Sequence, residues 1–71
     1  MSEWYLYIIE KKRKLYVGIT TDLENRLRQH GRPKLLFKEG PFEKEIAARR
    51  EKQIKGWRLE KKLKLVKNEL K

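Results

Sequence analysis

The chain contains no cysteine, one histidine and one serine, and these absences exclude most familiar catalytic frameworks. Without cysteine there is no disulfide, no thiol nucleophile and no cysteine-based zinc site, which fits a reducing cytosol. Ser2 is the only serine, so a Ser-His-Asp triad is excluded, and His30 alone cannot build a multi-histidine metal site. The four glycines are isolated, so the sequence contains no phosphate-binding glycine loop.

Long apolar runs are also absent. The longest aromatic and aliphatic stretch, "WYLYII" at residues 4–9, is followed directly by the charged stretch "EKKRK". This is far short of the roughly 20 residues that a membrane-spanning helix needs, and it is too short for the apolar region of a signal peptide. We therefore expect a soluble cytoplasmic protein with no membrane partner.

Acidic residues are few relative to basic ones. Ten Asp and Glu oppose twenty Lys and Arg, which gives a net charge of +10 on 71 residues. A field of this sign attracts polyanions, so the composition favours a nucleic-acid partner over a basic surface that is merely solvated. The length allows one small domain, and we expect residues 1–71 to form it as a monomer.

The apolar pattern predicts three strands and three helices in the order β-β-α-β-α-α. Strands are expected over 4–9, 15–19 and 34–40, and helices over 22–30, 43–57 and 59–70. The last segment is either a third helix or a continuation of the second. An antiparallel sheet this small needs helices to cover it. We therefore predict an α+β fold, a three-stranded antiparallel sheet flanked by helices, with the hairpin of the first two strands at its centre and a core over about 4–57.

Several local signals refine this prediction. Thr21 and Glu24 fit a capping box that starts the first helix, and Pro33 prevents that helix from continuing. Gly40-Pro41 is expected to break the third strand. The buried stripes are predicted to comprise Leu23 and Leu27; Ile46, Ala47, Arg50, Ile54 and Trp57; and Leu59, Leu63, Val66 and Leu70.

The side chains left for chemistry suit the cleavage of a phosphodiester. They are the phenols Tyr5, Tyr7 and Tyr16, the pair Arg26 and His30 one helical turn apart, and the carboxylate Glu51. A base or phenolate can help a water to attack phosphorus. A guanidinium can stabilise the charge that develops in the transition state, and a carboxylate can hold Mg²⁺ or Mn²⁺.

These residues occur in a recognisable arrangement. "YLY" at 5–7, "YVG" at 16–18, "GITTDLENRLRQH" at 18–30 and "ARREKQIKGW" at 48–57 resemble the GIY-YIG nuclease superfamily, most closely its small standalone UvrC-type branch. The resemblance implies a three-stranded antiparallel sheet with flanking helices. It also implies a divalent-metal-dependent endonuclease that hydrolyses DNA, in repair or recombination.

The resemblance also implies roles for individual residues. Tyr7 ends the first motif, Tyr16 begins the second and helps to activate the attacking water, and Gly18 ends the second motif and permits close approach. Arg26 contacts the scissile phosphate, His30 is a second polar contact, and Glu51 is the lone protein ligand of Mg²⁺ or Mn²⁺. Basic residues expected to contact DNA are Lys11, Lys12, Arg13, Lys14, Arg49 and Lys55.

Other interpretations of the same residues stay open. The tyrosines can be core residues, Arg26 and Glu51 can be solvated or paired surface charges, and His30 can simply end a helix. Tyr5 stands where the family's first motif has glycine, and the segment 31–34 is short for this branch. A weakly active or inactive nucleic-acid-binding module on the same fold is the main alternative. A protein that docks a partner through residues 59–70 is a third.

Overall fold

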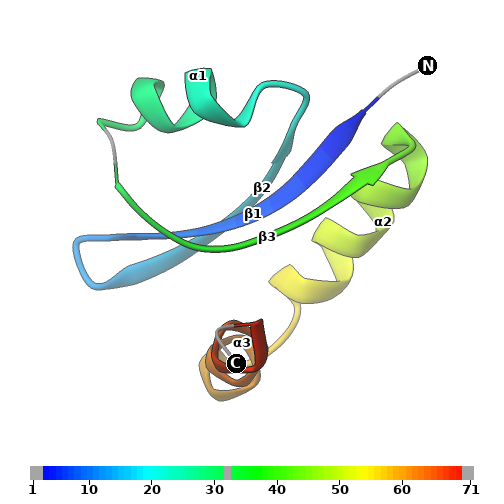
Figure 1. Ribbon diagram of the computed structural model, residues 1–71. Coiled ribbons are helices and arrows are strands. Elements are labelled where there is room, and N and C mark those ends of the chain that lie inside the picture. Colours follow the sequence, from blue (N-terminus) through cyan, green and yellow to red (C-terminus); the bar gives the residue numbers. More distant parts are fainter. Residues whose placement is uncertain (1–2, 32, 70–71) are drawn as a thin grey trace.

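A computed structural model describes residues 3–31 and 33–69 of the protein (Figure 1). Its elements are β1 (Trp4–Lys11), β2 (Lys14–Thr20), α1 (Leu23–Gln29), β3 (Lys34–Phe42), α2 (Lys44–Lys55) and α3 (Leu59–Glu69). This order confirms the predicted α+β fold with a three-stranded antiparallel sheet. None of the helices in the described part of the chain is both long enough and apolar enough to span a membrane.

The strand order in the sheet is β2-β1-β3, with both pairings antiparallel. The expectation of a central hairpin is therefore right for β1 and wrong for β2, which lies at an edge. The reason is that β3 hydrogen-bonds to the side of β1 that β2 leaves free. As the central strand, β1 is covered on both faces, and Leu6, Tyr7, Ile8 and Ile9 are all buried.

One face of the sheet makes the main hydrophobic core with α2 and α3. Ile8 of β1 pairs with Val17 of β2 and Phe37 of β3, so these three side chains share a face. They cluster with Leu6 and with Ile54 of α2 and Val66 of α3. A fully buried aliphatic side chain of this kind contributes roughly 1.5–3 kcal/mol, so this face is the main source of stability.

The opposite face carries the predicted residues Tyr7, Tyr16 and Gly18. Tyr7 pairs with Gly18 and Ile9 pairs with Tyr16, which places these side chains on the face away from the core cluster. Figure 1 shows α1 on this side of the sheet and α3 on the other. No residue of α1 is fully buried. Every residue of this helix therefore keeps some contact with solvent.

The start of α1 differs from the predicted capping box. Asp22, not Thr21, is the N-cap, and its Oδ1 accepts a hydrogen bond from the Asn25 backbone N–H at 3.1 Å. The Thr20 hydroxyl accepts from the Asp22 N–H at 3.1 Å. Because β2 continues to Thr20 and that hydroxyl forms the turn, the helix starts one residue later than predicted.

The third strand also differs, since β3 continues through Gly40 and Pro41 to Phe42. Proline is tolerated because β3 is an edge strand, where a missing backbone N–H costs little. Gly40 has a positive φ of 134°, and a Cβ there would lie 2.7 Å from the Trp4 carbonyl oxygen. Glycine at this position therefore allows the strand to continue against β1.

The predicted helical stripes are correct in part. Ala47 and Ile54 are buried as expected, but Ile46 is 51% exposed. In α3 the predicted Leu59 and Leu63 are also exposed, whereas Val66 is buried with Leu65 packed beside it; Leu70 lies outside the described residues. The chain turns after Gly56 into a separate helix. The direction of that turn decides that the face of α3 with Leu65 and Val66, and not the face with Leu59 and Leu63, packs against the sheet.

Arg50 occupies its buried-stripe position because it is paired. Its Nε donates to Glu39 Oε1 at 2.9 Å and its Nη2 donates to Oε2 at 3.4 Å. The guanidinium also lies 5.6 Å from the Trp57 ring centroid. These contacts join α2 to β3 on the core side of the sheet.

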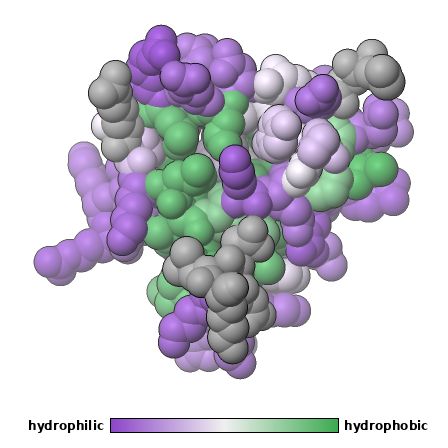
Figure 2. All heavy atoms as spheres, viewed as in Figure 1, coloured by the Kyte–Doolittle hydropathy of each residue, from purple (hydrophilic) through white to green (hydrophobic). Residues whose placement is uncertain are grey.

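In Figure 2 hydrophobic side chains gather across the middle of one face, with hydrophilic side chains around them.

Candidate active site

The site centres on the Tyr7 side chain, which lies over Gly18. The two residues are paired across β1 and β2, and Tyr7 is 5% exposed. A Cβ added to Gly18 would collide with the hydroxyl and ring of Tyr7. Glycine at position 18 therefore makes room for a neighbouring phenol in the sheet, which is a more specific role than the close approach predicted from the motif.

Charged groups from two helices lie close enough to influence the Tyr7 hydroxyl. Burial is the main effect and raises the pKa of Tyr7 above its ordinary value of 10.0. The Arg26 and Lys55 cations lower this pKa, whereas the Glu51 carboxylate raises it. The fold thus brings α1, β1 and α2 together at one phenol, and Tyr7 stays protonated at neutral pH as a hydrogen-bond donor rather than a phenolate base.

The raised pKa of Tyr7 has a consequence for stability at high pH. The folded state holds the phenolic proton more tightly than the unfolded state, so this contribution is complete below about pH 10 and is lost as the pH rises through the folded pKa. We expect the free energy of unfolding of the wild type to fall more steeply above about pH 10 than that of Tyr7→Phe. Denaturant titrations at a series of pH values measure it, and equal slopes for the two proteins would contradict it.

A second part of the site is a surface hollow beside Tyr7. Its volume is about 330 Å³, and Lys11, Lys12, Tyr16 and His30 line it. Tyr16 is 45% exposed, so part of its side chain is accessible to solvent. The His30 ring lies 6.5 Å from the Tyr7 ring, centroid to centroid, which connects the hollow to the buried phenol.

The end of α1 explains the positions of His30 and Arg26. His30 is the C-cap residue, and its backbone N–H bonds to the carbonyl of Arg26. One helical turn separates the two side chains, so both lie on the same side of α1. Within the described residues, no ion pair neutralises Arg26, and its side chain is exposed.

Glu51 of α2 is the carboxylate of the site. It is 23% exposed, and its Oε2 lies 3.3 Å from Lys55 Nζ. No three His, Cys, Asp or Glu side chains cluster as a metal site in the part of the chain that the structure describes. A single accessible carboxylate does fit Mg²⁺, which commonly keeps water and substrate phosphate as its other ligands.

The structure does not bring all the predicted residues together. Arg13, Lys14 and Arg49 are exposed and line neither the hollow nor the surroundings of Tyr7. Lys55, predicted as a DNA contact, forms an ion pair with Glu51, with Nζ 3.3 Å from Oε2. The spacing of four residues on one helix is the sequence signal that indicates this pair.

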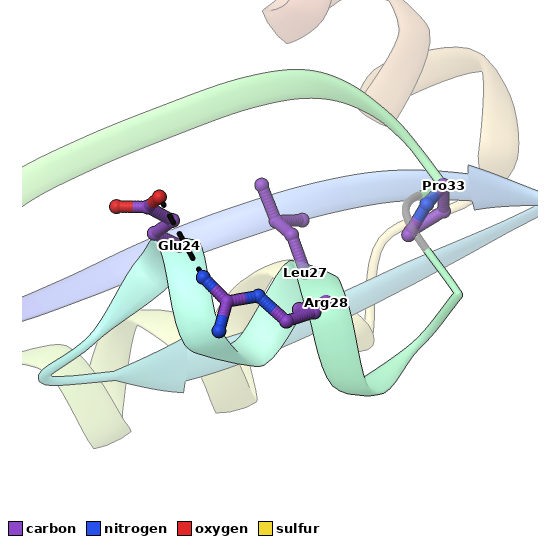
Figure 3. A pocket seen from close by; sticks show the side chains of 4 residues that line it. All are labelled: Glu24, Leu27, Arg28 and Pro33. Carbon is purple, nitrogen blue, oxygen red and sulfur yellow. Dashed lines mark ion pairs between the residues drawn. The ribbon is translucent and has the colours of Figure 1, made fainter.

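A separate hollow of about 380 Å³ lies where the chain passes from α1 towards β3, lined by Glu24, Leu27, Arg28 and Pro33 (Figure 3). Arg28 Nη2 lies 3.7 Å from Glu24 Oε1 across one turn of α1, and Figure 3 marks this pair. None of the predicted site residues lines this hollow. It is therefore distinct from the group around Tyr7.

Fold and site together define a small α+β domain that gathers phenols, an imidazole, a guanidinium and one carboxylate around the buried Tyr7 side chain. The family model described as the GIY-YIG catalytic domain matches residues 3–37, which include β1, β2 and α1. The chain is thus related to the GIY-YIG nuclease superfamily, and the resemblance predicted from its motifs is confirmed.

Curated relatives match a similar part of the chain. The UPF0213 protein YhbQ of Escherichia coli O8 (strain IAI1) is 58% identical over 31 residues, covering 42% of this chain and 31% of that protein. The UPF0213 proteins YhbQ of Escherichia coli O1:K1 / APEC and of Shigella boydii serotype 18 are 55% identical over the same coverage. The match thus spans about a third of these relatives' length. No solved structure matches the chain.

Proposed function

We propose that this protein is a divalent-metal-dependent endonuclease that hydrolyses phosphodiester bonds in DNA. The observation that carries the proposal is the grouping of Arg26, Glu51 and His30 around the Tyr7 phenol, itself seated on Gly18. The match to the GIY-YIG catalytic domain supports the reaction class. We take residues 1–71 as one domain of this kind. A place in DNA repair or recombination rests on the resemblance alone.

Each side chain has a role that its surroundings suit. Arg26 is exposed and cationic, and it would contact the scissile phosphate and stabilise the added negative charge of the transition state. Tyr16 is accessible and would orient the attacking water. Tyr7 is protonated and would donate a hydrogen bond to a phosphate or water oxygen, with His30 as a second polar contact.

The reaction itself is a simple exchange of bonds. A water oxygen forms a bond to phosphorus while the bond from phosphorus to a sugar oxygen breaks, and that oxygen leaves with a proton. Glu51 is the residue that would hold Mg²⁺ or Mn²⁺. Such an ion supplies charge neutralisation and a more acidic bound water when it is present. The Lys55 Nζ lies 3.3 Å from Glu51 Oε2, beside the carboxylate.

The test is a cleavage assay with the wild-type protein at low salt. Duplex, branched and single-stranded DNA are incubated with Mg²⁺ or Mn²⁺, with an EDTA-treated sample as the control. We expect products with the metal and none with EDTA, because the chelator removes the ion that Glu51 would hold, and with it the charge neutralisation that the ion would supply. The absence of cleavage on all three DNA forms would contradict the proposal.

A second candidate is a nucleic-acid-binding module without catalysis. Two observations favour it: Glu51 is already paired with Lys55, and the segment between α1 and β3 is short. This alternative expects binding with a steep dependence on salt concentration, since a +10 protein releases counterions from DNA. It also expects DNA binding to stay unchanged when Glu51 is replaced by Ala.

A further inference from the structure

The turn between β1 and β2 has an unfavourable backbone conformation for its sequence. Lys11 and Lys14 are the last paired residues, so Lys12 and Arg13 form a two-residue hairpin turn. Their φ angles are 52° and 65°, in the left-handed region. Hairpin turns with two positive φ angles strongly prefer Asn-Gly or Asp-Gly, because side chains with a larger Cβ substituent are strained there.

The strained turn lies beside the site. Lys12 and its neighbour Lys11 line the hollow of about 330 Å³ together with Tyr16 and His30. All four lining side chains are polar, two of them are cationic, and none is acidic. Strained backbone of this kind is often retained where it positions functional side chains. The sequence therefore places cations where a stable turn would place Asn and Gly.

We propose that the β1–β2 turn is a phosphate clamp, in which Lys11 and Lys12 hold a DNA phosphate next to the one that is cleaved. The inference rests on the proposed function for the scissile phosphate, and it adds a second contact with a specified location. Tyr16 and His30 line the hollow, and the His30 ring lies 6.5 Å from the Tyr7 ring. A strand that crosses both places would present successive phosphates to the lysines and to Arg26.

The clamp predicts that stability and DNA binding change in opposite directions at the turn. The double variant Lys12→Asn/Arg13→Gly relieves the strain, and we expect its Tm to rise by about 4–8 °C. The same variant loses the Lys12 contact, so its affinity for a duplex oligonucleotide should fall about tenfold. The matched control is Lys52→Ala/Lys67→Ala, which removes two exposed charges outside the hollow and should retain affinity within about threefold.

The single variant Lys12→Ala isolates the contact itself. Fluorescence anisotropy with a duplex oligonucleotide at several salt concentrations should give a slope of log K against log salt that is smaller by about 0.9 than that of the wild type. Where cleavage is measurable, KM should rise severalfold with little change in kcat. Lys67→Ala is the matched control, and Lys12→Arg should restore affinity.

The outcomes separate the clamp from the nuclease proposal. If the wild type cleaves DNA while Lys12→Ala matches Lys67→Ala in salt slope and KM, the clamp is wrong and the nuclease stands. If the wild type binds without cleaving and Lys12→Ala alone weakens binding, the nuclease is wrong, and what stands of the clamp is the contact between the turn and a DNA phosphate. An unchanged or lower Tm in Lys12→Asn/Arg13→Gly would overturn the claim that the turn exchanges stability for binding.

Discussion

Replacing Glu51 with Gln is expected to reduce metal-dependent DNA cleavage about a thousandfold, with DNA binding retained. The amide keeps the shape of the side chain but removes the charge that would hold Mg²⁺ or Mn²⁺. A catalytic metal supplies several kcal/mol of transition-state stabilisation, and each 1.36 kcal/mol corresponds to a tenfold change in rate. The rate is measured as kcat at saturating DNA over a range of Mn²⁺ concentrations.

The fold is expected to tolerate this substitution. The ion pair of Glu51 with Lys55 is largely solvent-exposed on the lysine side, and pairs of this kind contribute little to stability. Glu45→Gln is the matched control, because it removes an exposed carboxylate from the same helix. If Glu51→Gln cleaves DNA as fast as Glu45→Gln does, Glu51 does not hold the metal.

Arg26→Ala should have the second-largest effect, with a loss of about 10²–10³ in kcat. The exposed guanidinium near Tyr7 is the cation on α1 best placed to stabilise charge on the phosphate, and removing one such donor typically has this cost. Arg26→Lys should recover part of the rate, because an ammonium keeps the charge but not the planar fork of donors.

The control for Arg26 lies on the same helix. Arg28 is also exposed and basic, but it pairs with Glu24 and lines the hollow at the other side of α1. Arg28→Ala should therefore change kcat less than about threefold. Equal losses in the two variants would show that the general positive charge of α1, and not a specific contact from Arg26, supports the reaction.

The sheet and helices could be predicted from sequence because their signals are local. Alternating and helical periodicities located all six elements, and the sheet is antiparallel as expected. The errors concern contacts between elements. The N-cap of α1 is Asp22 and not the predicted Thr21, because the hydrogen bonds of Thr20 shape the turn before the helix. Leu63 is exposed because the turn after Gly56 sets the rotation of α3 about its axis.

The candidate site was found in the sequence by its motifs, but its geometry was not. The resemblance assigned roles to Tyr7, Arg26 and Glu51, which lie far apart in the chain. Only folding shows that the Tyr7 hydroxyl lies over Gly18 and senses the charges of both other residues. Likewise, the hollow beneath the β1–β2 turn exists only because the end of α1 returns to that turn.

The sequence by itself determined which chemical groups this protein has available. It is a basic chain without cysteine, with one histidine, a few phenols and a GIY-YIG motif set. The tertiary structure decided which of these groups meet. Periodicity depends on neighbours three or four residues apart, whereas the site depends on strand pairing and on helices packed from distant parts of the chain. For that reason the strand pairing that puts Gly18 beside Tyr7, and the effect of Glu51 on α2 on the same phenol, became visible only in the fold.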